Sequence, residues 1–342
     1  MTYLITGGSG FIGSHLVQQL IQNGHSVINI DNFDDFYDYR IKVHNTLEST
    51  GRKSGFVFTN KDQDIQKLIA ETSSDNYRLF YQDIRDVEGL ENIFSQYSID
   101  AIIHLAALAG VRPSIERPLE YEEVNIRGTM NLWELAKKHK INKFLCASSS
   151  SVYGNNEKVP FTETDPVDAP ISPYAATKRC TELLGHVYYH LYQIDMIHLR
   201  FFTVYGPRQR PDLAIHKFAG LMQRGELIPY YGDGTTARDY TYIDDIISGV
   251  LGALKYLEQN EGVYEIINLG ESEVIPLHQM VETLENTLAV PALKNTLPMQ
   301  PGDVQKTSAD IRKAKALIGY QPATNFQNGI KKFVEWFLRK GI

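Results

Sequence analysis

A glycine-rich loop at the start of the chain constrains the fold more than any other feature of the sequence. Residues 3–6 read as a strand, the loop carries Gly7, Gly10 and Gly13 in a GxxGxxG pattern, and an amphipathic stretch follows at residues 14–23. Glycines at this spacing allow a tight turn and a close approach of the backbone to a pyrophosphate at the positive end of the following helix. The pattern therefore predicts a dinucleotide site rather than an ordinary glycine-rich turn.

The residue that closes the second expected strand indicates which dinucleotide the loop binds. Asp31 ends the apolar run at residues 26–31, where an acidic side chain accepts hydrogen bonds from the hydroxyls of the adenine-bearing ribose. A 2′-phosphate there would meet a like charge, so we expect NAD rather than NADP. The alternative is that Asp31 only caps the following turn together with Asn32.

The first 200 residues alternate short apolar runs with amphipathic stretches. The runs expected to form strands are residues 3–6, 26–31, 79–81, 101–105, 143–147 and 196–201. Repeated strand, helix, strand order predicts an α/β fold, a Rossmann-type doubly wound parallel sheet with helices on both faces. In such a sheet, ligands bind at the carboxyl ends of the strands.

The later part of the chain has a different sequence pattern. From about residue 202 the sequence favours turns and shorter elements, with several prolines and a turn at residues 232–234. We expect residues 1–200 to form an NAD-binding Rossmann domain and residues 201–342 to form a smaller, substrate-binding α/β region. Residues 50–76 are polar and are expected to form an inserted loop or a short hairpin.

The composition excludes some classes of protein. A net charge of −7 and a pI near 5.8 give no sign of the clustered basic surface that nucleic-acid binding needs. No apolar run approaches membrane-spanning length, and the N-terminus lacks the pattern of a signal peptide. The two cysteines, Cys146 and Cys180, are expected to be reduced and buried. We therefore expect a soluble cytoplasmic protein with no nucleic-acid or membrane partner.

A tyrosine and a lysine mark the expected catalytic group. Tyr174 and Lys178 lie four residues apart in a stretch that reads as helix, so the phenol and the ammonium share one face. A neighbouring positive charge favours the phenolate, and a tyrosine with a reference pKa of about 10 can then act as a base near neutral pH. Ser149 follows the strand at 143–147, where its hydroxyl can donate to a substrate oxygen. Alone, the Tyr–Lys spacing is that of a surface pair; with the glycine loop it predicts hydride chemistry on an alcohol.

Some other residues are expected to be structural. His186 and His190 share helical spacing, but no third ligand or glutamate motif accompanies them, so we expect no metal site. The aromatic and apolar residues at 188–192 are expected to form a packing face. Trp133 and Trp336 read as core or interface residues.

Longer motifs extend these observations over essentially the whole chain. They are TGGSGFIG at 6–13, HLAA at 104–107, SSSSVYG at 148–154, SPYAATK at 172–178 and GDGTTARDYTYIDD at 232–245. With them the chain resembles the extended short-chain dehydrogenase/reductase superfamily. A narrower resemblance, to NAD-dependent nucleotide-sugar epimerases and most closely to UDP-glucuronate 4-epimerases, rests on DNFDDFYDYRIK at 31–42, AGVRPS at 109–114 and RFFTVYGPRQRPD at 200–212.

The resemblance implies roles for individual residues. Tyr174 would be the base, Lys178 its electrostatic partner and Ser149 the hydroxyl donor. The positions that line the NAD site in this family match Gly7, Gly10, Phe11, Ile12, Gly13, Asp31, Asn32, Asp83, Ile84, Leu105, Ala106, Ala107, Asn125, Tyr174 and Lys178. The positions that hold the UDP-sugar match Ser149, Ser150, Thr203, Arg210, Arg238 and Asp303. The family also implies a homodimer formed through a helix bundle, and the polar stretch between Lys42 and residue 79 is longer than usual for it.

The implied reaction is inversion at C4 of a UDP-sugar, most closely UDP-glucuronate to UDP-galacturonate. The alcohol is oxidised to a 4-keto sugar, which turns over in the pocket before hydride returns to its opposite face, so NAD stays bound. Arg238 is expected to grip the pyrophosphate and Arg210 the sugar carboxylate, unless both are solvated surface residues. Relatives that decarboxylate or dehydrate carry acids where this chain has Ser150 and Ser151, which favours epimerisation.

Other functions share the same expected site. They are a UDP-glucose or UDP-N-acetylglucosamine 4-epimerase, a 4-keto nucleotide-sugar reductase that consumes NADH, and a noncatalytic NAD sensor, since a fold alone does not establish function. Intact Ser149, Tyr174 and Lys178 argue against the sensor.

Overall fold

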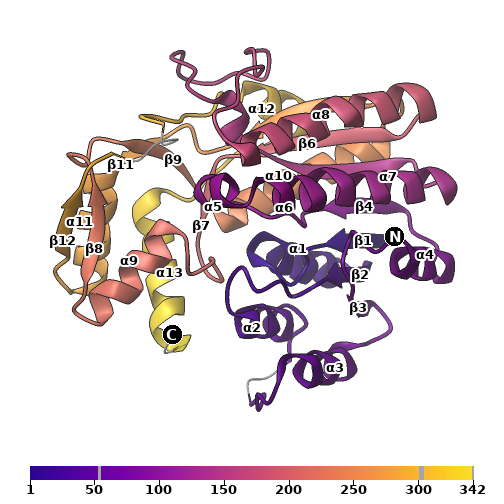
Figure 1. Cartoon of the computed structure of the whole chain (residues 1–342), viewed down its shortest axis with the longest axis horizontal. Coiled ribbons are helices and arrows are strands. Elements are labelled where there is room, and N and C mark those ends of the chain that lie inside the picture. The colour runs from indigo at the N-terminus through magenta and orange to yellow at the C-terminus, as the bar shows by residue number, and fades with distance from the viewer. Residues whose placement is uncertain (53–54, 300–303, 341–342) are drawn as a thin grey trace. The chain divides into compact units, whose positions relative to one another are not determined.

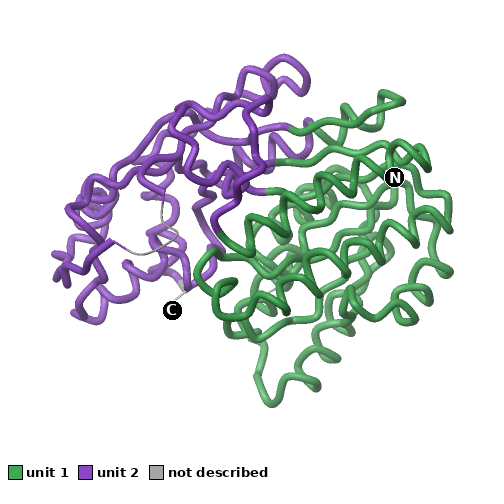
Figure 2. The backbone as a smooth tube through the Cα atoms, turned by 45° about the horizontal axis from the view of Figure 1, so that its top comes forward, with its two compact units in different colours: residues 1–148, 172–199, 253–266 green, residues 149–171, 200–252, 267–342 purple. Residues whose placement is uncertain are grey.

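The computed structural model of the chain describes residues 1–52, 55–299 and 304–340. Its contacts divide the chain into two compact units that interleave along the sequence. The first comprises residues 1–148, 172–199 and 253–266, and the second comprises residues 149–171, 200–252 and 267–342 (Figure 2). The boundary expected near residue 200 is one of several points at which the chain passes from one unit to the other.

A seven-stranded sheet forms the centre of the first unit, although the last residues of three of its strands, β5, β6 and β10, are counted with the second unit (Figure 1). Its strands are β1 Thr2–Thr6, β2 Ser26–Asp31, β3 Tyr77–Tyr81, β4 Ala101–His104, β5 Lys143–Ser149, β6 Asp195–Phe201 and β10 Tyr264–Leu269. They lie in the order β10-β6-β5-β4-β1-β2-β3, and β1 to β5 pair in parallel. The strand order reverses between β1 and β4, as in doubly wound Rossmann-type sheets, so the predicted fold class is confirmed.

Helices accompany this sheet along the first unit. They are α1 Phe11–Gln22, α2 Tyr39–Ser49, α3 Lys61–Thr72, α4 Val87–Gln96, α5 Val111–Glu116, α6 Pro118–Glu122, the π-helix η1 Glu123–Gly128, α7 Thr129–Lys138 and α8 Pro173–Tyr192. Leu4 and Ile28 belong to one core cluster with Trp133 of α7. Tyr3 and Val27, which point the other way along the same strands, are buried outside that cluster. Burial on both faces explains why the strands read as nearly continuous apolar runs.

The polar stretch at residues 50–76 contains the helix α3, so the expected loop or hairpin was wrong. Asn60 caps the helix with its side chain, and Ile65 faces the core. Asp64 in the first turn is buried and accepts a hydrogen bond from Tyr39 Oη at 2.8 Å. The helix was missed because part of its buried face is a carboxylate, bonded to Thr59 and Tyr39, rather than an apolar side chain.

The second unit contains two small sheets and most of the later helices. Its strands are β7 Thr203–Tyr205, β8 Leu227–Tyr231, β9 Ala237–Tyr242, β11 Val274–Pro276 and β12 Leu293–Leu297, in the orders β11-β9-β7 and β12-β8. Its helices are the 3-10 turn η2 Ser150–Tyr153, α9 Ala214–Gln223, α10 Ile243–Gln259, which continues into the first unit, α11 Leu277–Leu288, α12 Arg312–Ile318 and α13 Phe326–Lys340. With 17 and 15 residues, α10 and α13 are longer than the expected short elements. Neither helix contains a proline, and both accommodate glycines in their interiors, at Gly249, Gly252 and Gly329.

Several single-residue predictions can be compared with the structure. Cys146 is buried, but Cys180 is only half-buried, so the expectation of two buried thiols was wrong for the second. Trp133 and Trp336 are both buried. Within the described ranges, no helix combines the length and the apolar character that crossing a membrane requires.

Candidate active site

The glycine loop joins β1 to α1 in a conformation that excludes larger residues. Gly7 has φ +74°, and a Cβ added there would lie 2.8 Å from Ala106 N. A Cβ at Gly13 would lie 2.2 Å from Gly7 O. The helix begins after Gly10, and no side chain caps its first N–H groups. The uncapped donors and the close-packed glycines form a cradle that fits the pyrophosphate of a dinucleotide.

Asp31 ends β2 beside this loop and holds it in place. Its Oδ2 accepts a hydrogen bond from Ser9 N at 3.2 Å, and its Oδ1 accepts one from Phe33 N at 2.8 Å. The second bond is the turn-capping role considered as the alternative in the sequence. A carboxylate has about four acceptor positions, so capping the turn leaves room for a ribose hydroxyl as well.

Asn32 and Asp83 come together at the ends of β2 and β3. Asn32 Nδ2 donates to Asp83 Oδ2 at 2.9 Å, and Arg85 Nη2 donates to the same oxygen at 2.9 Å. Burial would raise the pKa of Asp83, but the hydrogen bonds from Arg85 and Asn32 outweigh it and lower that pKa. The carboxylate is thereby kept ionised as an acceptor beside the expected adenosine position.

The end of β4 is fastened to β1 through one threonine. Leu105 N donates to Thr6 O at 3.1 Å, and Ala106 N donates to Thr6 Oγ1 at 3.2 Å. His104 is buried between Thr6 Oγ1 at 2.7 Å and Thr129 Oγ1 at 2.8 Å. Burial lowers the pKa of His104 to about 3, so the ring is neutral. The sequence contained this histidine within the HLAA motif but gave no signal of its bridging position.

Asn125 lies in the π-helix η1 and connects the loop after β4 to α8. Its Oδ1 accepts from Leu108 N at 2.8 Å, and its Nδ2 donates to Leu108 O at 3.0 Å. The same Nδ2 donates to Thr177 Oγ1 at 3.1 Å, and Thr177 Oγ1 donates to Tyr174 O at 2.9 Å. A single π-turn, a feature often found at functional sites, thus supports the backbone that carries the expected base.

Tyr174 and Lys178 occupy the first two turns of α8. Ser172 caps the helix, and the ring of Tyr174 lies edge-on to the ring of Tyr121 with centroids 6.3 Å apart. Lys178 is buried, and its Nζ donates to Ala147 O at 2.8 Å. Burial lowers the pKa of Lys178 from 10.5 to about 8, although nearby groups partly oppose the shift. The ammonium is therefore charged at neutral pH and easily discharged above it.

Activity should decline as the pH rises through about 8, because Lys178 then loses the charge that favours the phenolate of Tyr174. The sign follows from burial, which stabilises the neutral amine and so moves the pKa down. The measurement is kcat/KM between about pH 6 and pH 10, with Lys178→Arg as the comparison, since a guanidinium stays charged over that range. A wild-type profile that stays flat beyond about pH 9 would contradict the assignment.

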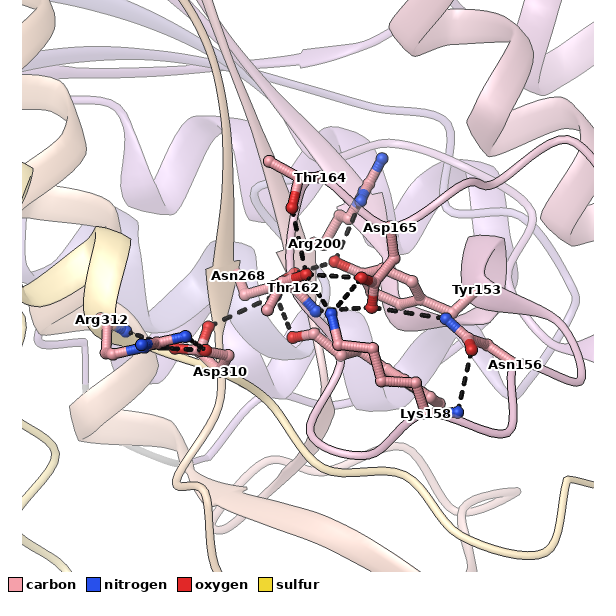
Figure 3. Close-up of polar contacts among 11 residues, drawn as sticks. Tyr153, Asn156, Lys158, Thr162, Thr164, Asp165, Arg200, Asn268, Asp310 and Arg312 are labelled. Carbon is pink, nitrogen blue, oxygen red and sulfur yellow. Dashed lines mark hydrogen bonds and ion pairs between the residues drawn. The ribbon is translucent and has the colours of Figure 1, made fainter.

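The serine-rich strand end belongs to the second unit and forms a compact turn. Ser149 Oγ accepts from Ser151 N at 3.2 Å and from Ser151 Oγ at 2.9 Å, and Ser150 opens η2. Ser149 Oγ is the acceptor in both contacts, so its own proton can be donated to a ligand oxygen. At the far end of η2, Tyr153 accepts from the buried Arg200 Nη1 at 2.9 Å (Figure 3).

One buried amide holds three segments of the second unit together. Asn268 Oδ1 accepts from Tyr153 Oη at 2.7 Å, and its Nδ2 donates to Phe161 O at 3.0 Å and Asp310 O at 3.4 Å. Figure 3 shows Asn268 between Tyr153 and Asp310. Its backbone N also donates to Glu163 Oε1 at 2.9 Å. Sequence reasoning missed Asn268, because nothing near it in the chain indicates these distant partners.

The expected sugar-binding residues lie on several elements of the second unit. Thr203 opens β7, and Arg238 lies on β9. Arg210 directs Nε and Nη2 to Asp212 at 3.0 and 2.8 Å. A ligand carboxylate at Arg210 would therefore share its guanidinium with Asp212. Asp303 lies outside the described residues.

The structure separates the expected site residues by unit. The cofactor set lies in the first unit and comes from the glycine loop, the ends of β2, β3 and β4, η1 and α8: Gly7, Gly10, Phe11, Ile12, Gly13, Asp31, Asn32, Asp83, Ile84, Leu105, Ala106, Ala107, Asn125, Tyr174 and Lys178. The described members of the sugar set lie in the second unit: Ser149, Ser150, Thr203, Arg210 and Arg238.

Comparison with known proteins adds a family to this geometry. The family model described as GDP-mannose 4,6 dehydratase matches residues 4–333. A UDP-glucuronate 4-epimerase of Thermodesulfobacterium geofontis is 41% identical over 335 residues, which cover 98% of this chain and 95% of that protein.

Two solved structures match the chain along its whole length. The crystal structure of UDP-glucuronic acid 4-epimerase from Bacillus cereus in complex with UDP-glucuronic acid and NAD gives a TM-score of 0.87 at 34% identity, and the match covers 99% of this chain and 100% of that one. The crystal structure of UDP-glucose 4-epimerase from Thermotoga maritima with UDP-glucose gives a TM-score of 0.83 at 32% identity, and the match covers 100% of both chains.

Proposed function

Because the chain belongs to the GDP-mannose 4,6-dehydratase family of extended short-chain dehydrogenases/reductases, we propose that it is an NAD-dependent UDP-sugar 4-epimerase. The substrate that we propose is UDP-glucuronate, with UDP-galacturonate as the product. The observation that carries the proposal is the buried Lys178 one turn after Tyr174, in the same unit as the glycine cradle. The similarity to the Bacillus cereus enzyme, whose structure holds UDP-glucuronic acid and NAD, supports the choice of sugar and cofactor.

Tyr174, Lys178 and Ser149 have separate roles in the proposed proton transfer. When bound in the cradle, NAD supplies the acceptor and then the donor of the hydride at C4. Tyr174 takes the proton from the C4 hydroxyl and later returns a proton to the 4-keto oxygen. Lys178, charged at neutral pH, favours the phenolate, and Ser149 donates a hydrogen bond to the same sugar oxygen.

The sugar carboxylate has to be restrained during this reaction. A 4-keto uronic acid is a β-keto acid, which loses carbon dioxide when its carboxylate bond stands perpendicular to the ketone plane. Ser150 and Ser151 offer hydroxyls rather than acids at the strand end, so no base is provided there for abstraction at C5. We propose that Arg210 holds the carboxylate away from the reactive alignment.

Replacing Arg210 by alanine should lower kcat/KM for UDP-glucuronate by about tenfold to a hundredfold, the worth of one charge-assisted hydrogen bond, and change UDP-glucose turnover by less than about threefold. Arg224→Ala is the matched control, since Arg224 forms a similar fork with Glu226 two residues later, at an exposed site. Equal losses on acidic and neutral sugars would remove the carboxylate role.

The function itself is tested by proton NMR of the purified protein with UDP-glucuronate, UDP-glucose and UDP-N-acetylglucosamine, without added cofactor. We expect inversion at C4 of UDP-glucuronate with no net consumption of NADH. Preferred turnover of a neutral sugar would replace the substrate, as the similarity to the Thermotoga maritima enzyme allows. Stoichiometric use of NADH would indicate a reductase, and NAD binding without any turnover would indicate a sensor.

The proposal also assigns the two ligands to parts of the chain and the protein to a cellular compartment. We propose that residues 1–200 mainly bind NAD and that residues 201–342 mainly bind the nucleotide sugar, with the serine turn at 149–151 joining the second group. Both cysteines are free thiols, which supports a reducing compartment and hence the cytoplasm.

The exposed face of α8 supports a homodimer. Leu183, Val187 and Leu191 recur at helical spacing and each is about half exposed, although they are large apolar side chains. Leu119 of α6, a helix that packs against α8, is more exposed still. A contiguous apolar face of this kind is typical of an interaction surface. We propose that a second copy of the chain covers it, forming a helix bundle.

The double variant Val187→Glu with Leu191→Glu should be monomeric where the wild type is dimeric, because it would bury two unpaired carboxylates. The dissociation constant should rise by at least about a hundredfold, as measured by light scattering after size exclusion. Leu338→Glu, which changes an exposed leucine of α13, is the control and should leave the mass unchanged. A double variant that stays dimeric would exclude this face as the interface.

A further inference from the structure

A buried lysine stands beside the acid that is expected to read the adenosine ribose. Lys42 on α2 is 8% exposed, and its Nζ lies 3.2 Å from Asp31 Oδ1. The ammonium also lies 5.5 Å from the centroid of the Tyr37 ring. No role was assigned to Lys42 from the sequence, where it is the last residue of the motif at 31–42. The packing of α2 makes it part of the ribose-facing group.

The helix that carries Lys42 is fastened to the glycine loop. Asn45 Nδ2 donates to Ser9 O at 3.3 Å, and Thr46 Oγ1 donates to Ser9 Oγ at 2.9 Å. Ser9 N in turn donates to Asp31 Oδ2. Lys42 is therefore held at a defined place relative to the cradle rather than on a free surface helix.

The geometry limits what a ligand meets at this position. Asp31 already accepts hydrogen bonds from Ser9 N and Phe33 N, and it forms an ion pair with Lys42. With about four acceptor positions on a carboxylate, one remains for a ribose hydroxyl. Phe33 N and Lys42 Nζ both contact Oδ1, so the remaining position is on Oδ2, which otherwise accepts only from Ser9 N. A group about 3 Å from Oδ2 lies within about 8 Å of Lys42 Nζ. The 2′-substituent would thus face a neutral acid–base pair rather than a bare carboxylate.

The two members of the pair act in opposite directions on a phosphate. A 2′-phosphate carries nearly two negative charges, so Asp31 repels it and Lys42 attracts it. A 2′-hydroxyl donates to Asp31 and gains little from the ammonium. Selectivity between NAD and NADP then depends on both residues, and removing one should shift it in the direction set by the other.

We propose that Lys42 is a specificity-determining residue of the dinucleotide site. Paired with Asp31 it moderates the rejection of a 2′-phosphate, and with the charge of Asp31 removed it binds that phosphate directly. This inference rests on the proposed function, because it requires a dinucleotide in the glycine cradle. The competing explanation is a purely structural ion pair, which would change stability but not the preference between the two cofactors.

The test is equilibrium binding of NAD and of NADP to nucleotide-free protein, measured by titration calorimetry for the whole chain. Asp31→Asn should gain NADP affinity and lower the NAD/NADP preference by at least about tenfold, the worth of one charge-assisted hydrogen bond. Lys42→Met should shift the preference the opposite way, toward NAD, by about threefold or more. The double variant should lose the NADP affinity that Asp31→Asn gained.

Controls separate this effect from a loss of structure. Lys61→Met removes a nearby ion pair, with the exposed Asp35, and should leave the preference unchanged. Lys42→Arg keeps the charge and should stay within about threefold of the wild-type preference. If thermal melting shows that Lys42→Met does not fold, a second set of variants replaces it. Asp31→Asn and Asp31→Ala are then each compared with Lys42 kept and with Lys42→Gln, and the NAD/NADP preference is measured as before.

Each result decides the matter. A double variant that binds NADP as well as Asp31→Asn does would overturn the role of Lys42, as would an unchanged preference in Asp31→Asn. In that case, wild-type NAD binding and NMR-detected epimerisation would leave the proposed function intact. A wild type that binds neither dinucleotide would overturn both proposals together.

Discussion

Replacing Tyr174 by phenylalanine should lower kcat by about 10² to 10⁴-fold while NAD stays bound, because this change removes the only atom that we assign to proton transfer at C4. The ring itself, which packs against the first-unit core and edge-on to Tyr121, is retained. The supporting bonds from Asn125 through Thr177 reach the backbone of Tyr174 and do not involve its hydroxyl. The loss should therefore appear in the chemical step and not in folding.

Tyr121→Phe is the matched control for this experiment. Tyr121 is buried beside Tyr174, and its hydroxyl donates to Ala109 O at 3.0 Å. Losing that bond should cost about 1 kcal/mol of stability and change turnover only a few-fold. Turnover is followed by NMR, and bound NAD is quantified after release from the protein. Substantial epimerisation by Tyr174→Phe would refute its role as the base.

Replacing Gly13 by alanine should abolish NAD binding and destabilise the fold by about 1–3 kcal/mol, the usual cost of forcing a methyl group into a filled site. The added Cβ would lie 2.2 Å from Gly7 O and 2.7 Å from Gly8 Cα, both of which are backbone atoms. Neither contact can be relieved by a side-chain rotation. The loop itself has to move, and with it the N–H groups at the start of α1.

Gly10→Ala separates ligand binding from folding. At Gly10 the added Cβ would meet only Gly7 O, at 3.2 Å, so stability should change little. NAD affinity should still fall, because the cradle requires the backbone to approach a pyrophosphate closely. Thermal melting and titration with NAD measure the two effects, and Gly220→Ala in α9 serves as a control outside the loop. A stable Gly13→Ala variant with normal NAD affinity would contradict the cradle.

The parts of the fold that the sequence predicted are those with local signals. Gly7, Gly10 and Gly13 are close in the chain, and the spacing alone describes a turn followed by a helix. The strands are buried on both faces, so each is a run of apolar residues that needs no knowledge of its neighbours. The same holds for Tyr174 and Lys178, whose shared face follows from helical geometry.

The parts that were missed depend on contacts between distant residues. Asp64 is an ordinary polar residue in the sequence, and its bonds to Tyr39 and Thr59 make it part of a buried helix face. Lys42 comes beside Asp31 because α2 packs on the glycine loop. Asn268 bonds to residues more than a hundred positions earlier in the chain. A single sequence does not indicate such partners, because no periodicity or spacing marks them.

The interleaving of the two units limits how this protein can be divided or recombined. A fragment that stops at residue 200 would lose β10, leaving β6 as an open sheet edge, and would lose Glu258, the acceptor of the Tyr3 hydroxyl. Exchanging the second unit with that of a relative would require three separate grafts, at residues 149–171, 200–252 and 267–342. Changes of substrate within this architecture are therefore more accessible through point substitutions than through the swapping of a detachable module.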